Sequence, residues 1–348
     1  MAAGAANETG LDKRGDYPPQ ILVLGAEASN PPQGIESITQ NASVSFARDG
    51  EALSRRLPGT DALFVWDFRS DELQQAWEWA DSLKWVHVAG AGVDAVLFPE
   101  LVESSVTLTN SRGVFDRPIA EYVIGLMLTF AKGFVATIGH QRGKQWVHRE
   151  TETLSGKRLL VVGAGPIGRE IARTARALGM HAQGVARSGR ERDEDFDRVI
   201  SDEFLGEALP EADYIVVAAP LTERTRGMFD WGRFAQMKPG ARFINVGRGP
   251  IVDEDALLEA LESGELSGAA LDVFQNEPLP QDSPLWEAEG MFVSPHMSGD
   301  FVGWLDALGE LFTENFGRWT RNEPLLNVVD KRRGYAGSGT SERREERG

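Results

Sequence analysis

Residues 158–168, Arg-Leu-Leu-Val-Val-Gly-Ala-Gly-Pro-Ile-Gly, form the stretch that decides the fold. Everything after Arg158 up to the first glycine is apolar, which predicts a buried strand, and the residues from Ile167 to Leu178 predict a helix. Gly163, Gly165 and Gly168 stand between the two elements. A strand, a G-x-G-x-x-G turn and a helix in this order are typical of a βαβ unit whose turn binds the pyrophosphate of a dinucleotide.

Each glycine of this turn has a separate physical reason. Gly163 allows the tight turn, Gly165 lets the backbone approach a pyrophosphate, and Gly168 lets the helix pack closely on the strand. We expect the phosphates to bind Gly163, Gly165 and Gly168 together with Pro166 and Ile167, because the first N–H groups of the helix lack intrahelical acceptors. The alternative is a glycine-rich turn without a ligand.

The next predicted strand, residues 181–186, ends in Val-Ala and is followed by Arg187 and Ser188. An acidic residue at this place would bind the ribose 2′-hydroxyl of NAD and repel a 2′-phosphate. A guanidinium and a hydroxyl instead favour the phosphate. The sequence therefore predicts a preference for NADP(H), with NAD(H) as a possible cofactor. The alternative is that Arg187 is only a solvated loop residue.

Strand and helix patterns alternate along most of the chain. We predict strands at residues 20–24, 62–66, 84–88, 106–109, 158–162, 181–186, 214–218, 242–246, 268–273 and 291–293. We predict helices at residues 71–80, 118–131, 167–178, 255–263 and 305–318. Such alternation predicts an α/β protein with parallel sheets.

Three charged or titratable residues follow short apolar runs in the second half of the chain, each with Gly or Pro close by: Arg248, Glu277 and His296. In α/β proteins the ends of parallel strands are where functional residues gather. A guanidinium binds a carboxylate through two parallel hydrogen bonds. An imidazole transfers a proton near neutral pH, and a carboxylate beside it favours its protonated form. The three residues together suit the reduction of a 2-keto acid.

Composition narrows the class of protein. The chain has 348 residues, no cysteine, and a formal net charge of −17. Disulfides and thiolate chemistry are therefore excluded, and a basic groove for nucleic acid is not expected. No apolar run reaches the roughly 18 residues of a transmembrane helix. Residues 1–19 lack the apolar segment of a signal peptide, so we expect a flexible tail and a cytoplasmic protein.

The surface charge also suggests an adaptation to salt. Only 7 of the 36 basic residues are Lys, and 53 residues are acidic. Concentrated salt screens the self-repulsion of such a chain, so we expect activity and folding to improve above about molar KCl, where the Debye length is about 3 Å. Assays across a KCl series check this, and an activity maximum in dilute buffer would contradict it. The alternative is an ordinary acidic, soluble enzyme.

Ordered motifs beyond the glycine turn carry a family resemblance. They are Ala219-Pro220-Leu221-Thr222 with Thr225 and Gly227, residues 237–253 around Asn245-Val246-Gly247-Arg248-Gly249, Leu271-Asp272-Val273-Phe274 with Glu277-Pro278, and Ser294-Pro295-His296. With these motifs the chain resembles the D-isomer-specific 2-hydroxyacid dehydrogenases over about residues 20–328, and within them the glyoxylate/hydroxypyruvate reductases. Ala218, where the family often has His, and the missing acid at Ala186 are departures from the pattern.

The resemblance implies two Rossmann-like, doubly wound parallel-sheet domains. Residues 20–112 and 297–330 would form a discontinuous substrate domain, and residues 113–296 the dinucleotide-binding domain. The linking segments would act as hinges, and the family usually forms dimers through the cofactor domain. Residues 331–348 we expect to be a disordered tail.

The resemblance also implies roles for individual residues. His296 would be the general acid, Glu277 would pair with it, and Arg248 would bind the substrate carboxylate and polarise the carbonyl. Asp272 resembles the anchor of the nicotinamide carboxamide. The backbone amides of the loop Ala91, Gly92 and Val93 would hold the other face of the substrate carboxylate. Further motif residues would line the cofactor site: Pro220, Thr225 and Val246.

The function implied is NAD(P)-dependent reduction of small 2-keto acids, such as glyoxylate or hydroxypyruvate, to D-2-hydroxy acids. No metal is needed, because Arg248 would do the work of an electrophile. Formate dehydrogenases share the scaffold but have Gln where Glu277 stands. The alternative to an enzyme is a dinucleotide-sensing binding protein with little turnover, which would resemble the corepressors that share this fold. Substrate size is left open by the sequence, and so is the lining of the pocket, for which Phe68, Met297 and Trp304 are candidates.

Overall fold

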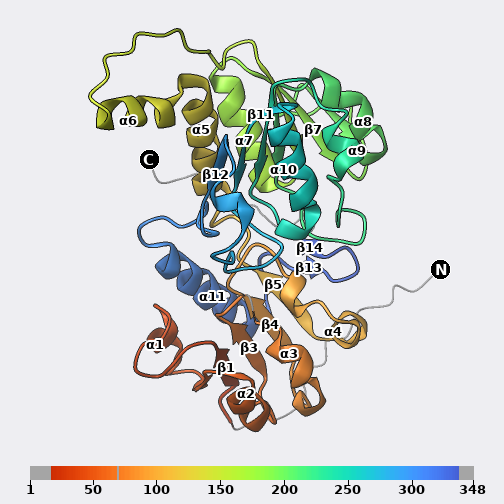
Figure 1. The fold of residues 1–348 in the computed structure, drawn as a ribbon. Coiled ribbons are helices and arrows are strands. Elements are labelled where there is room, and N and C mark those ends of the chain that lie inside the picture. Colours follow the sequence, from red (N-terminus) through yellow and green to blue (C-terminus); the bar gives the residue numbers. More distant parts are fainter. Residues whose placement is uncertain (1–16, 69, 337–348) are drawn as a thin grey trace, which may run out of the picture.

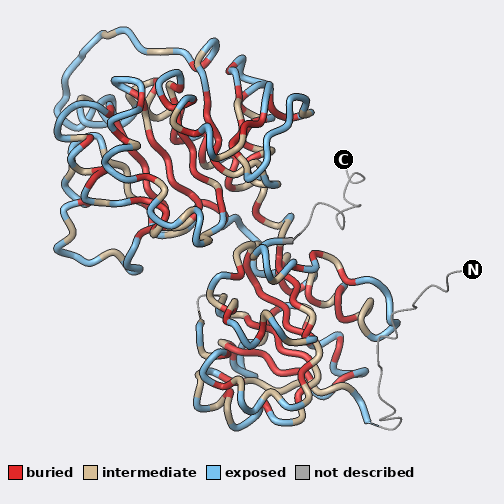
Figure 2. Tube along the Cα trace, turned by 90° about the vertical axis from the view of Figure 1, so that its right-hand side faces the viewer, coloured by how far each residue is buried: buried red, intermediate tan, exposed pale blue. Residues whose placement is uncertain are grey.

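The computed structural model describes residues 17–68 and 70–336. It has two domains, each built on its own parallel sheet (Figure 1). One cluster of buried apolar residues continues from one domain into the other, and the connection between the two domains is narrow (Figure 2). The expectation of an α/β protein with two doubly wound parallel-sheet domains is confirmed.

The smaller domain has five parallel strands in the order β2-β1-β3-β4-β5. The strands are β1 Gln20–Leu24, β2 Ser43–Ala47, β3 Ala62–Val65, β4 Trp85–Val88 and β5 Thr107–Asn110. Between them lie α1 Ile35–Ile38, α2 Gly50–Arg56, α3 Glu72–Gln75 and α4 Pro99–Glu103, with the 3₁₀ turns η1 Trp77–Trp79 and η2 Asp94–Val96.

The last helix of the chain, α11 Trp304–Thr320, packs on this N-terminal sheet. Phe312 stacks on Phe64 with ring centroids 4.2 Å apart and on Trp85 with centroids 5.2 Å apart. All three rings are fully buried, and burying such a side chain contributes about 1.5–3 kcal/mol. The smaller domain is therefore made of two separate parts of the chain, as expected.

The larger domain has seven parallel strands in the order β12-β11-β10-β9-β6-β7-β8. The strands are β6 Arg158–Val162, β7 His181–Ala186, β8 Arg198–Ser201, β9 Tyr214–Val217, β10 Ala241–Asn245, β11 Leu266–Leu271 and β12 Met291–Val293. The helices are α5 Asp116–Lys132, α6 Phe134–Arg142, α7 Pro166–Ala177, α8 Leu205–Ala208, α9 Trp231–Phe234 and α10 Glu254–Glu262. Because the strand order reverses between β6 and β9, the switch point lies beside the glycine turn that follows β6.

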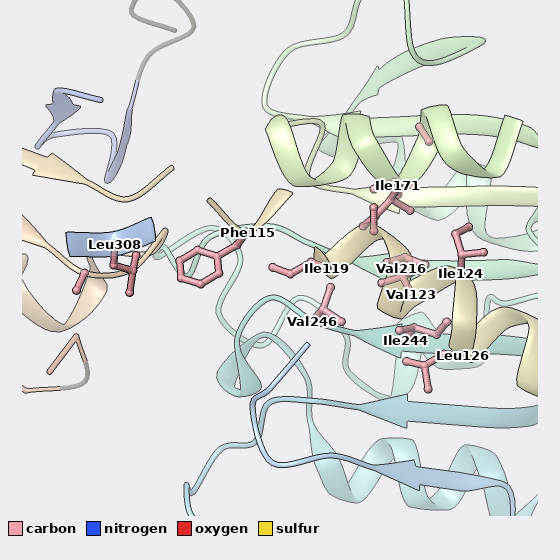
Figure 3. Packing of buried hydrophobic residues seen from close by; sticks show 14 of the residues in the cluster. Phe115, Ile119, Val123, Ile124, Leu126, Ile171, Val216, Ile244, Val246 and Leu308 are labelled. Carbon is pink, nitrogen blue, oxygen red and sulfur yellow. The ribbon is translucent and has the colours of Figure 1, made fainter. Parts of the chain in front are cut away.

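Helix α5 joins the two domains and is buried against the larger sheet. Its apolar side chains, among them Ile119 and Val123, lie against Ile171 of α7 and against Val216 and Ile244 of the sheet (Figure 3). Pro118 in its first turn is compatible with a helix start, since the N–H groups there have no intrahelical acceptor. This packing anchors the start of the larger domain directly after the segment that connects β5 to α5.

Several elements differ from those predicted. Strands β2 and β8 were not predicted, because both are edge strands whose sequences mix polar and apolar residues. The helix expected at residues 71–80 is instead α3 followed by the 3₁₀ turn η1. Among the described residues no single helix is long and apolar enough to cross a membrane; only α5 and α6 taken together pass that test, with a bend of 61° between them.

The disordered C-terminal tail predicted from residue 331 is wrong for the first residues of that range. Tyr335–Ala336 form strand β14, which pairs antiparallel with β13, Val329–Asp330. The Nζ of Lys331 donates hydrogen bonds to the carbonyls of Leu101 and Ser104, at 2.9 and 2.7 Å, at the end of α4. These bonds fix a segment that its polar composition alone did not predict. Residues 337–348, and residues 1–16 of the predicted N-terminal tail, lie outside the described residues.

Candidate active site

His296 and Glu277 lie in direct contact at the carboxyl edge of the larger sheet. The Nδ1 of His296 and Oε2 of Glu277 are 2.7 Å apart, and both side chains are about one fifth exposed, at 22% and 23%. The other oxygen of Glu277 accepts a hydrogen bond from the N–H of Phe274, 3.0 Å away. The carboxylate is thus held toward the imidazole, and Nε2 of the imidazole has no hydrogen-bond partner among the described residues.

Asp272, at the end of β11, holds the loop that carries His296. Its carboxylate accepts from Ser294 Oγ at 2.6 Å and from the N–H groups of Met297 and Ser298 at 3.0 and 2.8 Å. His296 itself has a φ of +54°, in the left-handed region that a residue with a side chain adopts at a cost of about 1–3 kcal/mol. Asp272 is only 1% exposed, so its observed contacts are with this loop. Its predicted contact with a nicotinamide carboxamide stays a prediction.

Arg248 follows β10 in a tightly packed turn. Asn245, at the end of β10, is fully buried; its Oδ1 accepts from the N–H of Gly247 and its Nδ2 donates to the carbonyl of Arg248, both at 3.0 Å. A Cβ on Gly249 would lie 1.9 Å from the backbone of Phe274, so only glycine allows this close approach. The turn bearing Arg248 therefore lies directly against the segment that leads to Glu277.

The smaller domain contributes two residues that the sequence analysis had not placed in the site. Asp94, at the start of η2, lies with its Oδ1 and Oδ2 at 3.1 and 3.3 Å from Nε of Arg248. Phe68, after β3, has its ring centroid 6.2 Å from that of His296, in an edge-on orientation. Phe68 had been named only as a possible pocket residue. No local signal marked Asp94, since its partner is 154 residues away.

A series of contacts shows that these groups surround one region. A Cβ on Gly92 would lie 1.8 Å from NH2 of Arg248, and a Cβ on Gly90 would lie 3.1 Å from Cβ of Phe68. The loop after β4 therefore touches both Arg248 and the phenyl ring that lies against His296. The structure brings the predicted catalytic trio together with the predicted substrate loop of Ala91, Gly92 and Val93. No acceptor among the described residues takes up the N–H groups of these three residues.

The glycine turn has the shape expected of a phosphate site. Gly163 has a φ of +110°, and a Cβ there would lie 2.6 Å from the backbone of Ala219. A Cβ on Gly168 would lie 1.9 Å from the carbonyl of Gly163, so the helix packs as closely as predicted. Space is open around Gly165, and α7 starts at Pro166 without a side-chain cap. These features fit a pyrophosphate bound at the start of a helix.

Arg187 and Ser188 lie in an exposed turn after β7. The turn is fixed, because Arg190 and Val199 exchange two backbone hydrogen bonds, of 2.7 and 3.0 Å. Arg190 is paired with Asp193, whereas among the described residues Arg187 has no ion-pair partner. A free guanidinium at this strand end is available to an anionic group.

The remaining predicted cofactor residues also lie at carboxyl ends of strands in the larger sheet. Pro220 follows β9, and Thr225 holds that loop by donating to the Pro220 carbonyl at 2.7 Å and accepting from the N–H of Thr222 at 2.8 Å. Val246 follows β10 and is 7% exposed. In the observed strand order these residues share one sheet edge with the glycine turn.

The other histidines have no place in this site. His87 is fully buried in the smaller domain, with Nδ1 at 2.7 Å from Oγ1 of Thr109. Burial lowers its pKa to about 3, because the charged form would lose its hydration. It is a neutral residue of the core of the smaller domain.

Comparison with known proteins gives a consistent result. The model of the D-isomer specific 2-hydroxyacid dehydrogenase NAD-binding domain matches residues 124–298. The chain is 31% identical to the glyoxylate reductase of Thermofilum pendens over 304 residues, covering 84% of this chain and 88% of the relative.

Solved structures agree over almost the whole chain. A D-isomer specific 2-hydroxyacid dehydrogenase family protein from Aeromonas salmonicida has a TM-score of 0.77 at 32% identity, over 90% of this chain and 99% of that one. The NADPH-dependent glyoxylate/hydroxypyruvate reductase of Sinorhizobium meliloti, solved with NADP and sulfate, has a TM-score of 0.77 at 29% identity, over 92% of this chain and 100% of that one.

Proposed function

Because this chain belongs to the D-isomer-specific 2-hydroxyacid dehydrogenase family, we propose that it reduces small 2-keto acids to D-2-hydroxy acids with NADP(H) as the preferred cofactor. The observation that carries the proposal is the contact between His296 and Glu277 beside the turn of Arg248. Glyoxylate and hydroxypyruvate are the first substrates to test, since similar proteins bear these names.

His296 acts as the general acid. Its Nδ1 is engaged by Glu277, so Nε2 carries the proton that passes to the carbonyl oxygen during reduction. Glu277 fixes the ring orientation through its contact with Nδ1. In the reverse direction the same nitrogen accepts the proton of the hydroxyl group. Asp272 acts on this step indirectly, by holding the backbone on both sides of the imidazole.

Arg248 binds the substrate carboxylate through its guanidinium and stabilises negative charge on the carbonyl oxygen. The free N–H groups of the loop Ala91, Gly92 and Val93 complete the carboxylate site. The glycine turn and the start of α7 would hold the pyrophosphate of a dinucleotide. A bound nicotinamide would supply the hydride for the reduction.

A direct test mixes the purified chain with NADPH or NADH and a panel of 2-keto acids of increasing size, and follows the absorbance of the reduced nicotinamide. We expect decay with at least one small 2-keto acid. The absence of decay with every acid, in dilute and in concentrated KCl, would instead favour a dinucleotide-sensing binding protein.

The cofactor preference gives a separate prediction. Arg187 is exposed and has no ion-pair partner in the part of the chain that the structure describes, so replacing it with Ala removes the predicted contact with a 2′-phosphate. We expect kcat/KM for NADPH to fall by about tenfold or more, equivalent to 1.4 kcal/mol, with kcat/KM for NADH nearly unchanged. Arg198→Ala, an exposed arginine at the other end of the neighbouring strand β8, is the control. A wild-type enzyme that uses NADH as well as NADPH would contradict the preference.

We further propose a homodimer formed through the larger domain. Helix α6 and the segment after it extend away from that domain (Figure 1) and carry exposed apolar side chains, including Val135 at 64% and Trp146 at 99% exposure. Apolar groups gathered on one extension are typical of a protein–protein contact. Light scattering of the full chain tests this, and a monomer at micromolar concentration would refute it. A cytoplasmic location and the salt dependence stay predictions.

A further inference from the structure

The carboxylate of Asp94 contacts Arg248, the residue that we propose binds the substrate carboxylate. Its two oxygens lie 3.1 and 3.3 Å from Nε of Arg248, and neither side chain is fully exposed, at 34% for Asp94 and 24% for Arg248. Asp94 directly follows the substrate loop Ala91, Gly92 and Val93 in the smaller domain, whereas Arg248 belongs to the larger domain. The ion pair therefore connects the two domains at the site.

We propose that Asp94 is a positioning residue, which holds the Nε edge of Arg248 so that the other end of the guanidinium faces the substrate carboxylate. The proposal rests on the proposed function, because it takes Arg248 as the carboxylate-binding group. It adds a residue from the smaller domain whose effect on the reaction passes through Arg248.

The hydrogen-bond inventory of the guanidinium supports this role. Of its five N–H groups, the one on Nε points to Asp94, and NH1 donates one to the carbonyl of Gly247 at 2.8 Å. NH2 lies over Gly92, where a Cβ would be only 1.8 Å away. Among the described residues NH2 has no acceptor, and one N–H of NH1 also remains. These two nitrogens form the parallel pair that a carboxylate binds.

Fixing an arginine side chain before its ligand binds lowers the loss of conformational entropy on binding. A free arginine side chain loses considerable rotamer freedom when it is ordered, and a guanidinium held at Nε and NH1 has already lost it. Because Asp94 and Arg248 lie on different domains, this ordering depends on the relative position of the domains. The carboxylate site is then complete only when the domains are as close as observed here.

The charge of Asp94 has the opposite effect. A carboxylate near the bound substrate repels the substrate carboxylate, so an Asp94 that only competed for Arg248 would raise the KM for the 2-keto acid. A positioning residue lowers that KM. The sign of the change on removing Asp94 therefore separates the two roles.

The experiment compares Asp94→Ala and Asp94→Asn with the wild-type full chain, at saturating cofactor and with the best 2-keto acid of the panel. For Asp94→Ala we expect the KM of the 2-keto acid to rise about tenfold or more, with the KM of the cofactor unchanged. Asp94→Asn keeps an oxygen that accepts from Nε and should recover most of the loss. Glu100→Ala removes an exposed carboxylate of α4 in the same domain and should change neither constant.

Titration of the unreactive carboxylate oxamate into the protein–cofactor complex, by calorimetry, gives a second readout that needs no turnover. We expect about tenfold weaker binding for Asp94→Ala. An unchanged or lower KM together with unchanged oxamate binding would overturn the inference, as would equal defects in Asp94→Ala and Asp94→Asn. A wild type that binds oxamate more tightly than Asp94→Ala does but reduces no 2-keto acid would refute the proposed function alone. A wild type that neither binds oxamate nor turns over would refute both.

Discussion

Replacing His296 with Gln is expected to lower kcat by about 10²–10⁴-fold, the usual contribution of a positioned general acid. Glutamine keeps a polar side chain of similar reach but has no proton to deliver at neutral pH. Because the loop is held mainly by Asp272 through backbone N–H groups, the variant should fold and bind cofactor normally. Single-turnover and steady-state rates with the best 2-keto acid measure the effect.

The matched control is His181→Gln, an exposed histidine at the amino end of β7, on the opposite edge of the same sheet. It should retain full activity. Glu277→Gln should give an intermediate loss, because the amide still contacts the imidazole but the hydrogen bond to Nδ1 is no longer made by a carboxylate. A His296→Gln enzyme that keeps more than about a tenth of the wild-type kcat would remove His296 from the role of general acid.

Replacing Arg248 with Lys is expected to reduce kcat/KM by about 10²–10³-fold. An ammonium is a point charge that cannot offer two parallel N–H groups to a carboxylate. It also cannot reproduce the simultaneous contacts with Asp94 and the Gly247 carbonyl. Steady-state kinetics with varied 2-keto acid measure the loss, which should be in the KM of the acid and in kcat.

A second variant displaces the side chain of Arg248 without replacing it. Gly92→Ala would place a Cβ 1.8 Å from NH2 of Arg248, and the end of a flexible side chain can move aside. We expect a folded protein whose guanidinium is displaced, with a loss of kcat/KM comparable to that of Arg248→Lys. Gly232→Ala on α9, where a Cβ meets only ordinary contact distances, is the control. Normal activity of Gly92→Ala would show that the observed position of Arg248 does not matter for turnover.

Much of the fold could be predicted from local sequence. Strands β1 and β6, which lie inside their sheets, have the predicted bounds, because buried strands of a parallel sheet are continuous apolar runs. The glycine turn was also predictable, because its three glycines stand at a fixed spacing between a predicted strand and a predicted helix. The edge strands β2 and β8 were missed because their solvated faces interrupt the apolar pattern.

Part of the candidate site could also be predicted from the sequence, and part could not. Arg248, Glu277 and His296 were recognisable because each follows an apolar strand and has Gly or Pro close by. The contact of Glu277 with His296 was expected from the resemblance and is present at 2.7 Å. Neither Asp94 nor the part of Asp272 in holding the His296 loop was predicted, because these depend on which loops the two sheets bring together.

The sequence alone determined the kind of fold, the phosphate turn and the chemical types at the strand ends, since each depends on interactions between residues close along the chain. The return of α11 to the first sheet was implied by the family resemblance and by no local pattern, and only the tertiary structure decided that Asp94 meets Arg248 across 154 residues. Long-range contacts of this kind follow from how the buried faces of two sheets and their helices pack, and no local pattern encodes them.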